Sequence, residues 1–544
     1  MRLLGLALTG EYKGLRDQTF DFTQSEDGVI ALIGLNGSGK SQLLELVAES
    51  FAYLERAVRE EFRARRHMPF KVELIYSALD ESANTPQPVT IGVEIALDGS
   101  VSAMLQREDD WEPVTTEFIP LPRHVVGYAS GLNENLQRAF LKNALQYFDV
   151  MQIRANRRKK LEGLTVDEAE VDRIEEHYFL RHRGVFEPIY RDDPIQLNER
   201  DTPLPTLKFI DYDCAALLLA SLSFQPRTFF DRVFPDIAHR YPHKLVIRYD
   251  LRNAPIAPDT SKDILQLIRI VGPHSVQGLC PRTNDQEYEI HELDYLAADI
   301  VIDLESAGLR GLFENTYLGE PIRFFEKLYK IQLLGIRAWQ SLDKKELRKD
   351  DFFGNVKKPL KTKLPLSITE LKLQSATGEL VDFDDLSDGE SQLIQTLGAA
   401  YLFGRNSLFL FDEPDTHLNP EWRTNFHKHL KSAMAGTDSA QAFVTTHSPF
   451  LISSLKKENV FLVEKNDNHI TSMAPVPHET YGASFEVLIK QYFGLTTAIS
   501  QTAVDDITHQ LHSAGLSKAE QRQWIEQHLG ESMEKAYLLK RLED

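Results

Sequence analysis

Short apolar runs bounded by glycine and polar residues alternate with longer segments whose apolar residues recur every three or four positions. The runs VIALI at 29–33 and LFLF at 408–411 predict buried strands, and AFVTTH at 442–447 predicts a strand that ends at His447. The segments QLLELVAESFAYLERAV at 42–58 and SQLIQTLGAAYLF at 391–403 have helical spacing. Buried strands alternating with helices predict an α/β fold formed by the two ends of the chain.

The middle of the chain has a mixed pattern. Segments of helical and strand-like spacing follow one another there: FLKNALQYFDVMQIRANRRKKLEGL, DYDCAALLLASLSF and RFFEKLYKIQLLGIRAWQSL as helices, KLVIRYDLR and ADIVIDLES as strands. No heptad pattern persists through three or four repeats, which argues against long coiled-coil arms. From residue 500 onward, SKAEQRQWIEQHL and MEKAYLLKRL predict short amphipathic helices, which pack on the body of the protein or on a partner.

These changes of pattern predict four parts of the chain. The expected parts are two halves of one α/β domain at 1–140 and 366–490, a large inserted mixed domain at 141–365, and a helical C-terminal region at 491–544.

Composition indicates an ordinary globular protein of 544 residues, with 42% hydrophobic and 26% charged residues. We expect no membrane span and no signal segment, because no apolar stretch approaches 18 residues. Cys214 and Cys280 have no metal-ligand spacing and are expected to be inert thiols in a reducing cytoplasm.

The formal net charge of −20 argues against a protein that coats nucleic acid. Three basic runs, at 59–67, 154–160 and 357–363, are the candidates for contact with a phosphate backbone. A solvated helix face or loop is the more ordinary interpretation of each run.

The stretch GLNGSGKS at 34–41 follows the strand VIALI and precedes a helix. It matches G-x-x-x-x-G-K-[ST], the loop whose backbone N–H groups surround nucleotide phosphates. Lys40 is expected to reach the outer phosphates, and Ser41 to bind Mg²⁺. The candidate ATP-binding residues of this loop are Gly34, Asn36, Gly37, Ser38, Gly39, Lys40 and Ser41.

A second strand, in SLFLFDEP at 407–414, ends in two consecutive carboxylates. Asp412 suits the magnesium site, and Glu413 suits the general base that orients the attacking water. Consecutive strand residues face opposite sides of a sheet, so both carboxylates can serve one site only at the end of the strand.

The motif LSDGE at 386–390 lies at the N-terminus of a predicted helix. Ser387 and Gly389 could direct a hydroxyl and N–H groups toward an anion. The alternative is an ordinary helix cap, because Ser387 with Glu390 also matches a capping box. Further along the chain, His447 is placed to contact a γ-phosphate and to respond to its loss.

In this order, GLNGSGKS, LSDGE, FLFDEP, DTHLNP and TTHSP resemble the motifs of ABC-type ATPases, and more narrowly those of the RecF, SMC and OLD branch. The resemblance implies a head-to-tail homodimer, or a higher oligomer, that encloses two ATP molecules with Mg²⁺. It implies that Ser387, Gly389 and Glu390 contact the ATP of the opposite subunit, and that Glu413 and His447 are catalytic.

One element of that family has no clear counterpart. The loop that carries a conserved glutamine in the family should fall in RHVVGYASGLNENL at 123–136, where Ser130 and Asn133 are the candidates. Its absence puts the coupling between the lobes in doubt and implies slow ATP hydrolysis.

The phrases RLLGLALTGEYKGLRDQTFDF, VVGYASGLNENL and TYGASFEVL resemble the PtuA-like ATPases of Septu and retron anti-phage defence systems, also described as restriction system-associated AAA ATPases. The resemblance implies a partner HNH nuclease, PtuB-like, and in retrons a reverse transcriptase with its RNA–DNA product.

Two other classes are open on the sequence. A RecF-like repair ATPase would clamp DNA without a nuclease. An OLD-type ATPase–nuclease would need a Toprim domain, which Glu464, Asp505 and Asp506 could begin to supply, but 80 residues after Glu464 are expected to be too few for it.

The chain shows no second set of catalytic motifs. His291 and Glu292 lack the second histidine of a zinc protease site, and no HNH-like histidine cluster is present in the sequence. We therefore expect any nucleic-acid cleavage to be carried out by another polypeptide.

Overall fold

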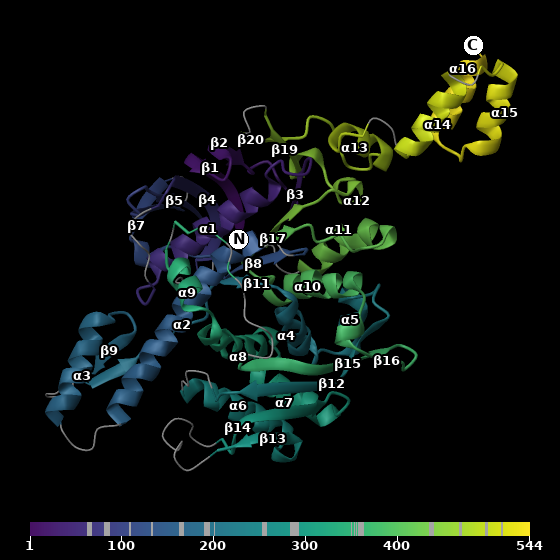
Figure 1. Ribbon diagram of the computed structural model, residues 1–544. Helices are drawn as coiled ribbons and strands as arrows, with labels where there is room; N and C mark the ends of the chain where they lie inside the picture. Colours follow the sequence, from purple (N-terminus) through teal and green to yellow (C-terminus); the bar gives the residue numbers. More distant parts are fainter. Residues whose placement is uncertain are drawn as a thin grey trace. The chain divides into compact units, whose positions relative to one another are not determined.

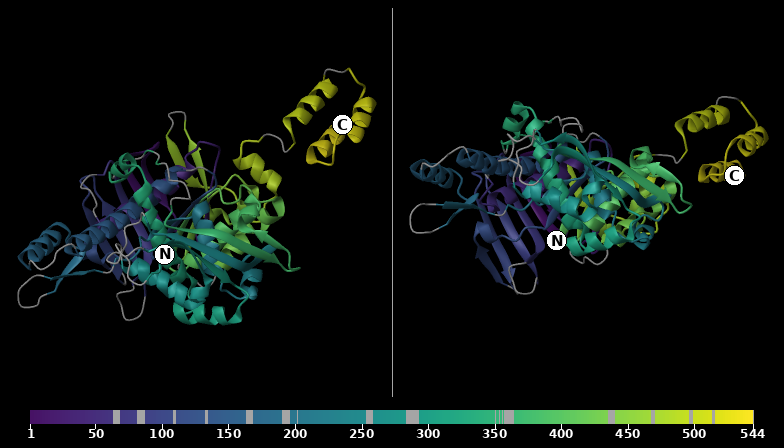
Figure 2. Two further views of the ribbon diagram at one scale, coloured as in Figure 1. Left: turned by 60° about the horizontal axis from the view of Figure 1, so that its bottom comes forward. Right: turned by 90° about the horizontal axis from the view of Figure 1, so that it is seen from below.

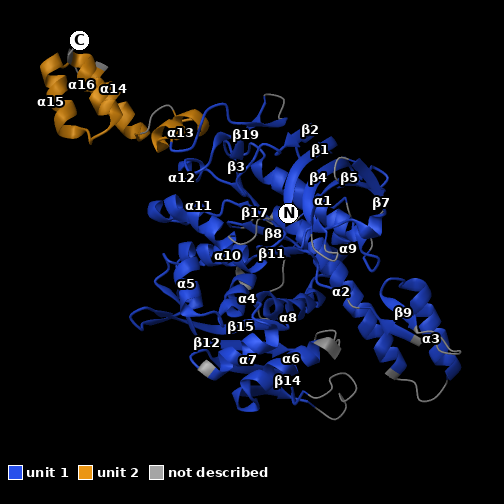
Figure 3. Ribbon diagram, turned by 180° about the vertical axis from the view of Figure 1, so that it is seen from behind, with its two compact units in different colours: residues 1–482 blue, residues 483–544 orange. Residues whose placement is uncertain are grey.

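The computed structural model forms two compact units, residues 1–482 and residues 483–544 (Figure 3). It describes residues 1–62, 68–80, 87–107, 110–131, 134–162, 168–189, 196–200, 202–252, 258–282, 293–349, 351–352, 354, 356, 364–434, 440–466, 470–495, 499–512 and 515–543.

A seven-stranded sheet forms the centre of the first unit, in the order β11-β8-β17-β18-β3-β19-β20. Its first six strands are parallel and β20 is antiparallel. The predicted strands at 29–33 and 408–411 are confirmed as β3 and β17. The bounds are β3 Val29–Ile33, β8 His124–Ala129, β11 Leu207–Phe209, β17 Ser407–Asp412, β18 Gln441–Thr445, β19 Val460–Lys465 and β20 Thr471–Pro475.

Helices that follow strands of this sheet cover it, as the sequence predicted. The helix α1 (Lys40–Val58) follows β3, and α11 (Pro420–Met434) connects β17 to β18. The helix α10 (Asp388–Phe403) precedes β17, and α12 (Pro449–Ile452) follows β18. The predicted strand ending at His447 is shorter than expected. It ends at Thr445 because the Thr446 side chain turns to Asp415 and Ser448 caps α12.

An antiparallel sheet packs on the other side of α1, in the order β2-β1-β4-β5-β6-β7 (purple to blue in Figure 1). The rings of Phe51 from α1 and Tyr76 from β4 meet edge to face at 5.4 Å in this core. The bounds are β1 Arg2–Tyr12, β2 Leu15–Asp21, β4 Lys71–Asp80, β5 Gln87–Ile95, β6 Val101–Arg107 and β7 Asp110–Val114.

The central part of the chain exchanges strands with the two ends. The strand β11 comes from the expected insert yet pairs with β8 in the central sheet. Conversely, β15 (Leu366–Ser375) lies beyond residue 365 yet pairs with β12 (His239–Asp250) in a five-stranded sheet of order β13-β14-β12-β15-β16 (Figures 1 and 2). The other strands are β13 Val276–Pro281, β14 Tyr295–Asp303 and β16 Leu380–Asp382.

The remaining helices of the first unit follow the predicted mixed pattern, although the segment 323–342 is a helix only as far as Leu333 and then a 3-10 turn. Their bounds are α2 Glu134–Glu162, α3 Glu168–Arg181, α4 Tyr212–Leu222, α5 Arg227–Val233, α6 Pro258–Val271, α7 Ala307–Tyr317, α8 Pro321–Leu333 and α9 Ser341–Leu347. A hairpin of β9 (Phe186–Ile189) and β10 (Gln196–Glu199) packs with α3 on α2.

The basic run at 154–160 is not a uniformly solvated face. Arg157 is buried and donates to Glu175 Oε2 at 2.7 Å, and Arg158 pairs with Glu199 at 3.0 Å. Arg154 is buried as well. The runs at 59–67 and 357–363 lie mostly or wholly outside the described residues, as does the pair His291 and Glu292.

The second unit consists of helices, as predicted for the C-terminal region: α13 Phe485–Tyr492, α14 Gln501–His512, α15 Lys518–His528 and α16 Met533–Glu543. Asp505 and Asp506 lie on an exposed face of α14. None of the described helices is long and apolar enough to cross a membrane.

Candidate functional site

The loop 34–41 connects β3 to α1, and its glycines adopt conformations that favour glycine. Gly34, Gly37 and Gly39 have φ values of 144°, 77° and 112°. A Cβ on Gly34 would lie 2.1 Å from the Val463 carbonyl oxygen, and one on Gly39 would lie 2.7 Å from Thr471 Oγ1. A Cβ on Gly37 would meet nothing within 4 Å. The loop is therefore packed against the β19–β20 hairpin on one side and open on the other.

The open side of the loop suits a phosphate group. Gly39 offers no side-chain cap to α1, so the first N–H groups of the helix are available to an anion. Ser38 Oγ is buried and has no hydrogen-bond partner among the residues that the structure describes. Asn36 and Gly37 line the exposed part of the loop. These features fit the phosphates of a nucleotide.

Lys40 is buried at the start of α1, and its ammonium lies in the middle of the site. Its Nζ donates to the carbonyl oxygens of Gly34 at 3.0 Å and Leu35 at 3.1 Å, and lies 2.9 Å from His447 Nε2. Burial lowers the pKa of Lys40, while Glu413 and Asp412 oppose that shift.

Asp412, at the end of β17, faces Ser41 at the start of α1. Ser41 Oγ donates to Asp412 Oδ1 at 2.9 Å, and Thr445 Oγ1 donates to the same oxygen at 2.6 Å. Within the described residues no three His, Cys, Asp or Glu side chains form a metal cluster. Mg²⁺ beside ATP does not need one, because one or two protein oxygens and the substrate phosphates suffice. Ser41 and Asp412 thus fit Mg²⁺.

Glu413 brings the second carboxylate to the same side of the sheet through an unusual backbone conformation. Its φ is 52°, which is uncommon for a residue other than glycine. Its N–H donates to Thr445 Oγ1 at 2.9 Å and lies 3.2 Å from the Thr445 carbonyl oxygen. The Glu413 side chain then lies with Oε1 3.6 Å from His447 Nε2. This turn places Asp412 and Glu413 in one site, as the sequence required.

His447 lies two residues beyond β18, between Lys40 and Glu413. Burial, and secondly the Lys40 charge, lower the pKa of His447 below its ordinary value of 6.5. The imidazole is therefore neutral at pH 7. Its Nε2 accepts a hydrogen bond from the Lys40 ammonium, which assigns the ring proton to Nδ1.

The start of α10 contains Ser387, Gly389 and Glu390. There the structure shows the ordinary helix cap that the sequence also allowed. Ser387 and Glu390 form a complete capping box, with Glu390 Oε2 accepting from Ser387 N at 3.1 Å and Ser387 Oγ at 2.8 Å. A Cβ on Gly389 would lie 2.8 Å from the His417 carbonyl oxygen. Ser387 itself is exposed, so its outer side is free for a partner molecule.

Several contributors to the site were not found from the sequence. Gln392, five positions after Ser387, is buried and joins three segments. Its Nε2 donates to Tyr128 Oη at 3.1 Å and to the Glu413 carbonyl oxygen at 3.3 Å, and its Oε1 accepts from His417 N at 3.0 Å. A glutamine among the apolar residues of α10 was the signal that could have identified it.

Two further residues hold the turn after β17 and the loop. Asp415 is buried, accepts from Thr446 Oγ1 at 2.8 Å, and has a pKa raised by its burial. Thr471 Oγ1 donates to the Ser38 carbonyl oxygen at 3.0 Å. Of the two candidates for the missing glutamine, Ser130 donates its backbone N–H to the Asp412 carbonyl oxygen at 2.9 Å, and Asn133 lies outside the described residues.

Glu464, the first residue considered for a Toprim domain, lies exposed on β19. That strand pairs in parallel with β3 and is therefore part of the central sheet.

One match to a protein family agrees with an ATPase domain. Residues 227–453 match the family described as "AAA domain, putative AbiEii toxin, Type IV TA system", a range that contains Ser387, Asp412, Glu413 and His447 but not the loop 34–41. "Protein ea59" of Escherichia phage lambda is 31% identical over 90 residues, which are 16% of this chain and 17% of the phage protein. The chain thus spans less than a fifth of that relative's length in the match.

Solved structures of SMC heads are also similar to this chain. The SMC head domain from Thermotoga maritima is 13% identical with a TM-score of 0.30, over 88% of this chain and 100% of that one. The Smc head domain with an extended coiled coil, bound to the C-terminal domain of ScpA, from Pyrococcus furiosus is 14% identical with a TM-score of 0.31, over 87% and 96%. The Smc head domain with a coiled coil and joint from Pyrococcus yayanosii gives 14% and 0.31, over 91% and 99%. The family match covers less than half of the chain, and its description as an AAA domain agrees with the P-loop geometry of residues 34–41.

Proposed function

We propose that this protein is the ATP-binding and ATP-hydrolysing component of a bacterial anti-phage defence system, in which it controls a partner HNH nuclease. The observation that carries the ATPase part is the convergence of five side chains from three separate segments. Lys40 and Ser41 come from α1, Asp412 and Glu413 from the end of β17, and His447 from the segment after β18.

The geometry supports hydrolysis by in-line attack of water. The loop amides and Lys40 would hold the phosphates, and Ser41 and Asp412 would hold Mg²⁺, which would supply positive charge next to the phosphate oxygens. Glu413 orients the water and accepts its proton. His447 lies 3.6 Å from that carboxylate and 2.9 Å from Lys40, so it can register whether the terminal phosphate is present.

A head-to-tail homodimer would complete the site. Ser387 is exposed at the beginning of α10, where its hydroxyl and the helix N-terminus can contact the ATP of the opposite subunit. Gln392 connects this helix to the Glu413 carbonyl, so an ATP contact at Ser387 is mechanically linked to the catalytic turn of the same chain.

The partner nuclease is the part of the proposal that rests on resemblance. The family match names a toxin of a type IV TA system, which supports a role in a multicomponent system. The helix α16 carries the exposed hydrophobic residues Met533 and Tyr537, which suit a protein contact. A restraining reverse transcriptase with its RNA–DNA product is a further element of this proposal.

Purified protein tests the proposal directly. We expect Mg²⁺-dependent phosphate release from ATP and no cleavage of DNA or RNA by the protein alone. Together with the HNH protein encoded beside it, we expect a stable complex whose nuclease activity depends on ATP. Deletion from residue 500 onward should release the nuclease while ATP binding persists. Cleavage by the lone protein that is lost on changing Glu464 or Asp505 would favour the OLD-type alternative instead.

A further inference from the structure

A polar cavity of about 1000 Å³ lies within the first unit. Its lining includes the end of α1, the starts of β8 and β11, and residues of α2, α7 and α8. A volume of this size is at the upper end of the range for small-molecule sites.

This cavity is remote from the P-loop. The pairing of β8 with β17 sets His124 level with Ser407 and Ala129 level with Asp412, so the starts and ends of these strands are roughly 17 Å apart. The helix α1 runs from Lys40 at the P-loop to Val58 at the cavity, about 27 Å at the usual helical rise. The cavity therefore lies at the amino edge of the central sheet, opposite the ATPase site.

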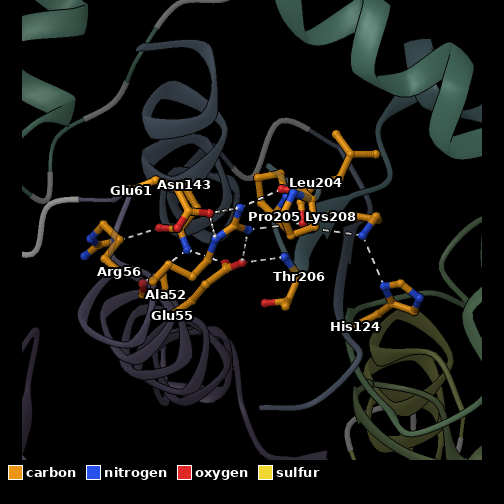
Figure 4. Close-up of polar contacts among 12 residues, drawn as sticks. Ala52, Glu55, Arg56, Glu61, His124, Asn143, Leu204, Pro205, Thr206 and Lys208 are labelled. Atoms are coloured by element: carbon orange, nitrogen blue, oxygen red, sulfur yellow. Dashed lines mark hydrogen bonds and ion pairs between the residues drawn. The ribbon is translucent and has the colours of Figure 1, made fainter. Parts of the chain in front are cut away.

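Lys208 lines this cavity and is a buried cation, and no carboxylate among the described residues forms an ion pair with it. Its Nζ donates to the Pro205 carbonyl oxygen at 2.9 Å and lies 3.1 Å from His124 Nδ1 (Figure 4). His124 is itself buried, and burial together with the Lys208 charge lowers its pKa well below the ordinary value, so its ring is neutral and does not balance the ammonium. The third N–H of Lys208 has no acceptor among the described residues.

Arg154 is the second such cation, on the α2 side of the cavity. It is 4% exposed, and its Nη2 donates to Thr202 Oγ1 at 2.5 Å. Its Nε is buried and has no hydrogen-bond partner within the described part of the chain. A guanidinium with five N–H donors and one neutral acceptor is strongly under-satisfied.

Within the described residues, no carboxylate around the cavity forms an ion pair with these two cations, although the charges of Glu326 and Glu55 partly oppose the lowering of the Lys208 pKa. Glu55 and Glu61 both pair with Arg59, and Glu60 pairs with Arg200. A buried charge without a partner costs several kcal/mol in folding free energy, so it is normally removed or paired. Elsewhere in this chain the rule holds, because buried Arg138 and Lys142 both bind Glu49, at 3.0 Å each.

We propose that this cavity binds a phosphate-bearing ligand, with Arg154 and Lys208 as its anion-binding residues and Thr202 beside them. Phosphate oxygens accept several hydrogen bonds from guanidinium and ammonium groups, and their charge would balance both cations. The phosphate could belong to a small phosphorylated molecule or to the end of a nucleic-acid strand. Burial lowers the pKa of Lys208 to about 8, which is consistent with an ammonium that lacks its anion.

Two probes distinguish these sources of phosphate. Pyrophosphate and a 5′-phosphorylated ten-nucleotide DNA, with its unphosphorylated form as control, are titrated by calorimetry into full-length Lys40→Ala protein. The same titrations are made with Arg154→Met or Lys208→Met added, and with the exposed Arg522→Met as the matched control. Thermal unfolding without ligand is measured for each protein.

We expect at least one probe to bind and its affinity to fall ten-fold or more in both cavity variants, with no change in Arg522→Met. Binding of pyrophosphate supports a small ligand, and phosphate-dependent binding of DNA alone supports a strand end. The melting temperature of both cavity variants should be unchanged or higher, since an unpaired buried charge is removed. No binding of either probe, equal affinities in the variants, or a lower melting temperature with unchanged affinity would overturn the proposal.

Discussion

The two edges of the central sheet hold charged side chains in opposite ways. At the carboxyl edge, one ammonium lies among two carboxylates and a neutral imidazole, and nearly every polar group has a partner. At the amino edge, Lys208 and Arg154 are buried beside neutral acceptors. The comparison indicates that the carboxyl edge is suited to Mg²⁺ together with ATP, and the amino edge to an anion.

The largest effect should come from removing the general base at the carboxyl edge. Glu413→Gln is expected to retain ATP while slowing its hydrolysis by about 10²- to 10⁴-fold, because the amide can position water but cannot accept its proton. Single-turnover phosphate release and nucleotide binding measure the two properties separately. Glu479→Gln, a change at an exposed carboxylate of the same unit, serves as the control. An unchanged rate would move the base to another residue, with His447 the first to examine.

The amino edge should show its unpaired charge in the pH dependence of stability. Between pH 8 and pH 10.5, Lys208 is protonated in the unfolded chain but has lost its proton in the folded protein. The contribution of Lys208 to the free energy of unfolding therefore increases as the pH rises. Lys208→Met removes that contribution. The free energy of unfolding of the variant minus that of the wild type should therefore be larger at pH 7 than at pH 10.5, by about 3 kcal/mol. Denaturant unfolding at the two pH values measures this difference, and parallel pH profiles would contradict the assignment.

A smaller loss is expected from the exposed side of α10. Ser387→Arg should reduce ATP turnover on the order of ten-fold by blocking the opposite subunit's ATP, with ATP affinity retained in the P-loop. Loss of the helix cap alone costs about 1 kcal/mol in stability. Ser517→Arg is the matched control, because Ser517 forms the same capping box with Glu520 in α15. If Ser387→Arg and Ser517→Arg both turn over ATP normally, Ser387 is only a cap.

The difference between the edges also explains what could be predicted from sequence. The carboxyl edge is built from short contiguous motifs, each a strand end followed by polar residues. The sequence could therefore predict that Lys40, Asp412 and His447 lie near one another. The turn at Glu413 and the role of Gln392 depend on packing between distant segments and were missed. Arg154 belongs to the basic run at 154–160, whereas Lys208 stands alone in the sequence. Only the fold shows that both are buried, with no ion pair to a carboxylate of the described residues.

The exchange of strands between the middle and the ends of the chain has a similar cause. Both β12 and β15 have clear strand patterns, but they pair across more than a hundred residues. A local pattern predicts that a segment is a strand, but it does not identify the distant strand with which that segment will pair.

The most direct test of the ATPase site is the affinity of the full-length protein for ATP after Lys40→Ala, measured by calorimetry with Mg²⁺. The substitution removes the ammonium that lies between the loop carbonyls and His447, while the cavity at the amino edge is left intact. We expect ATP binding to become undetectable in this variant and to remain at the wild-type level in Arg154→Met. Undiminished ATP affinity in Lys40→Ala would show that the loop 34–41 is not the nucleotide site.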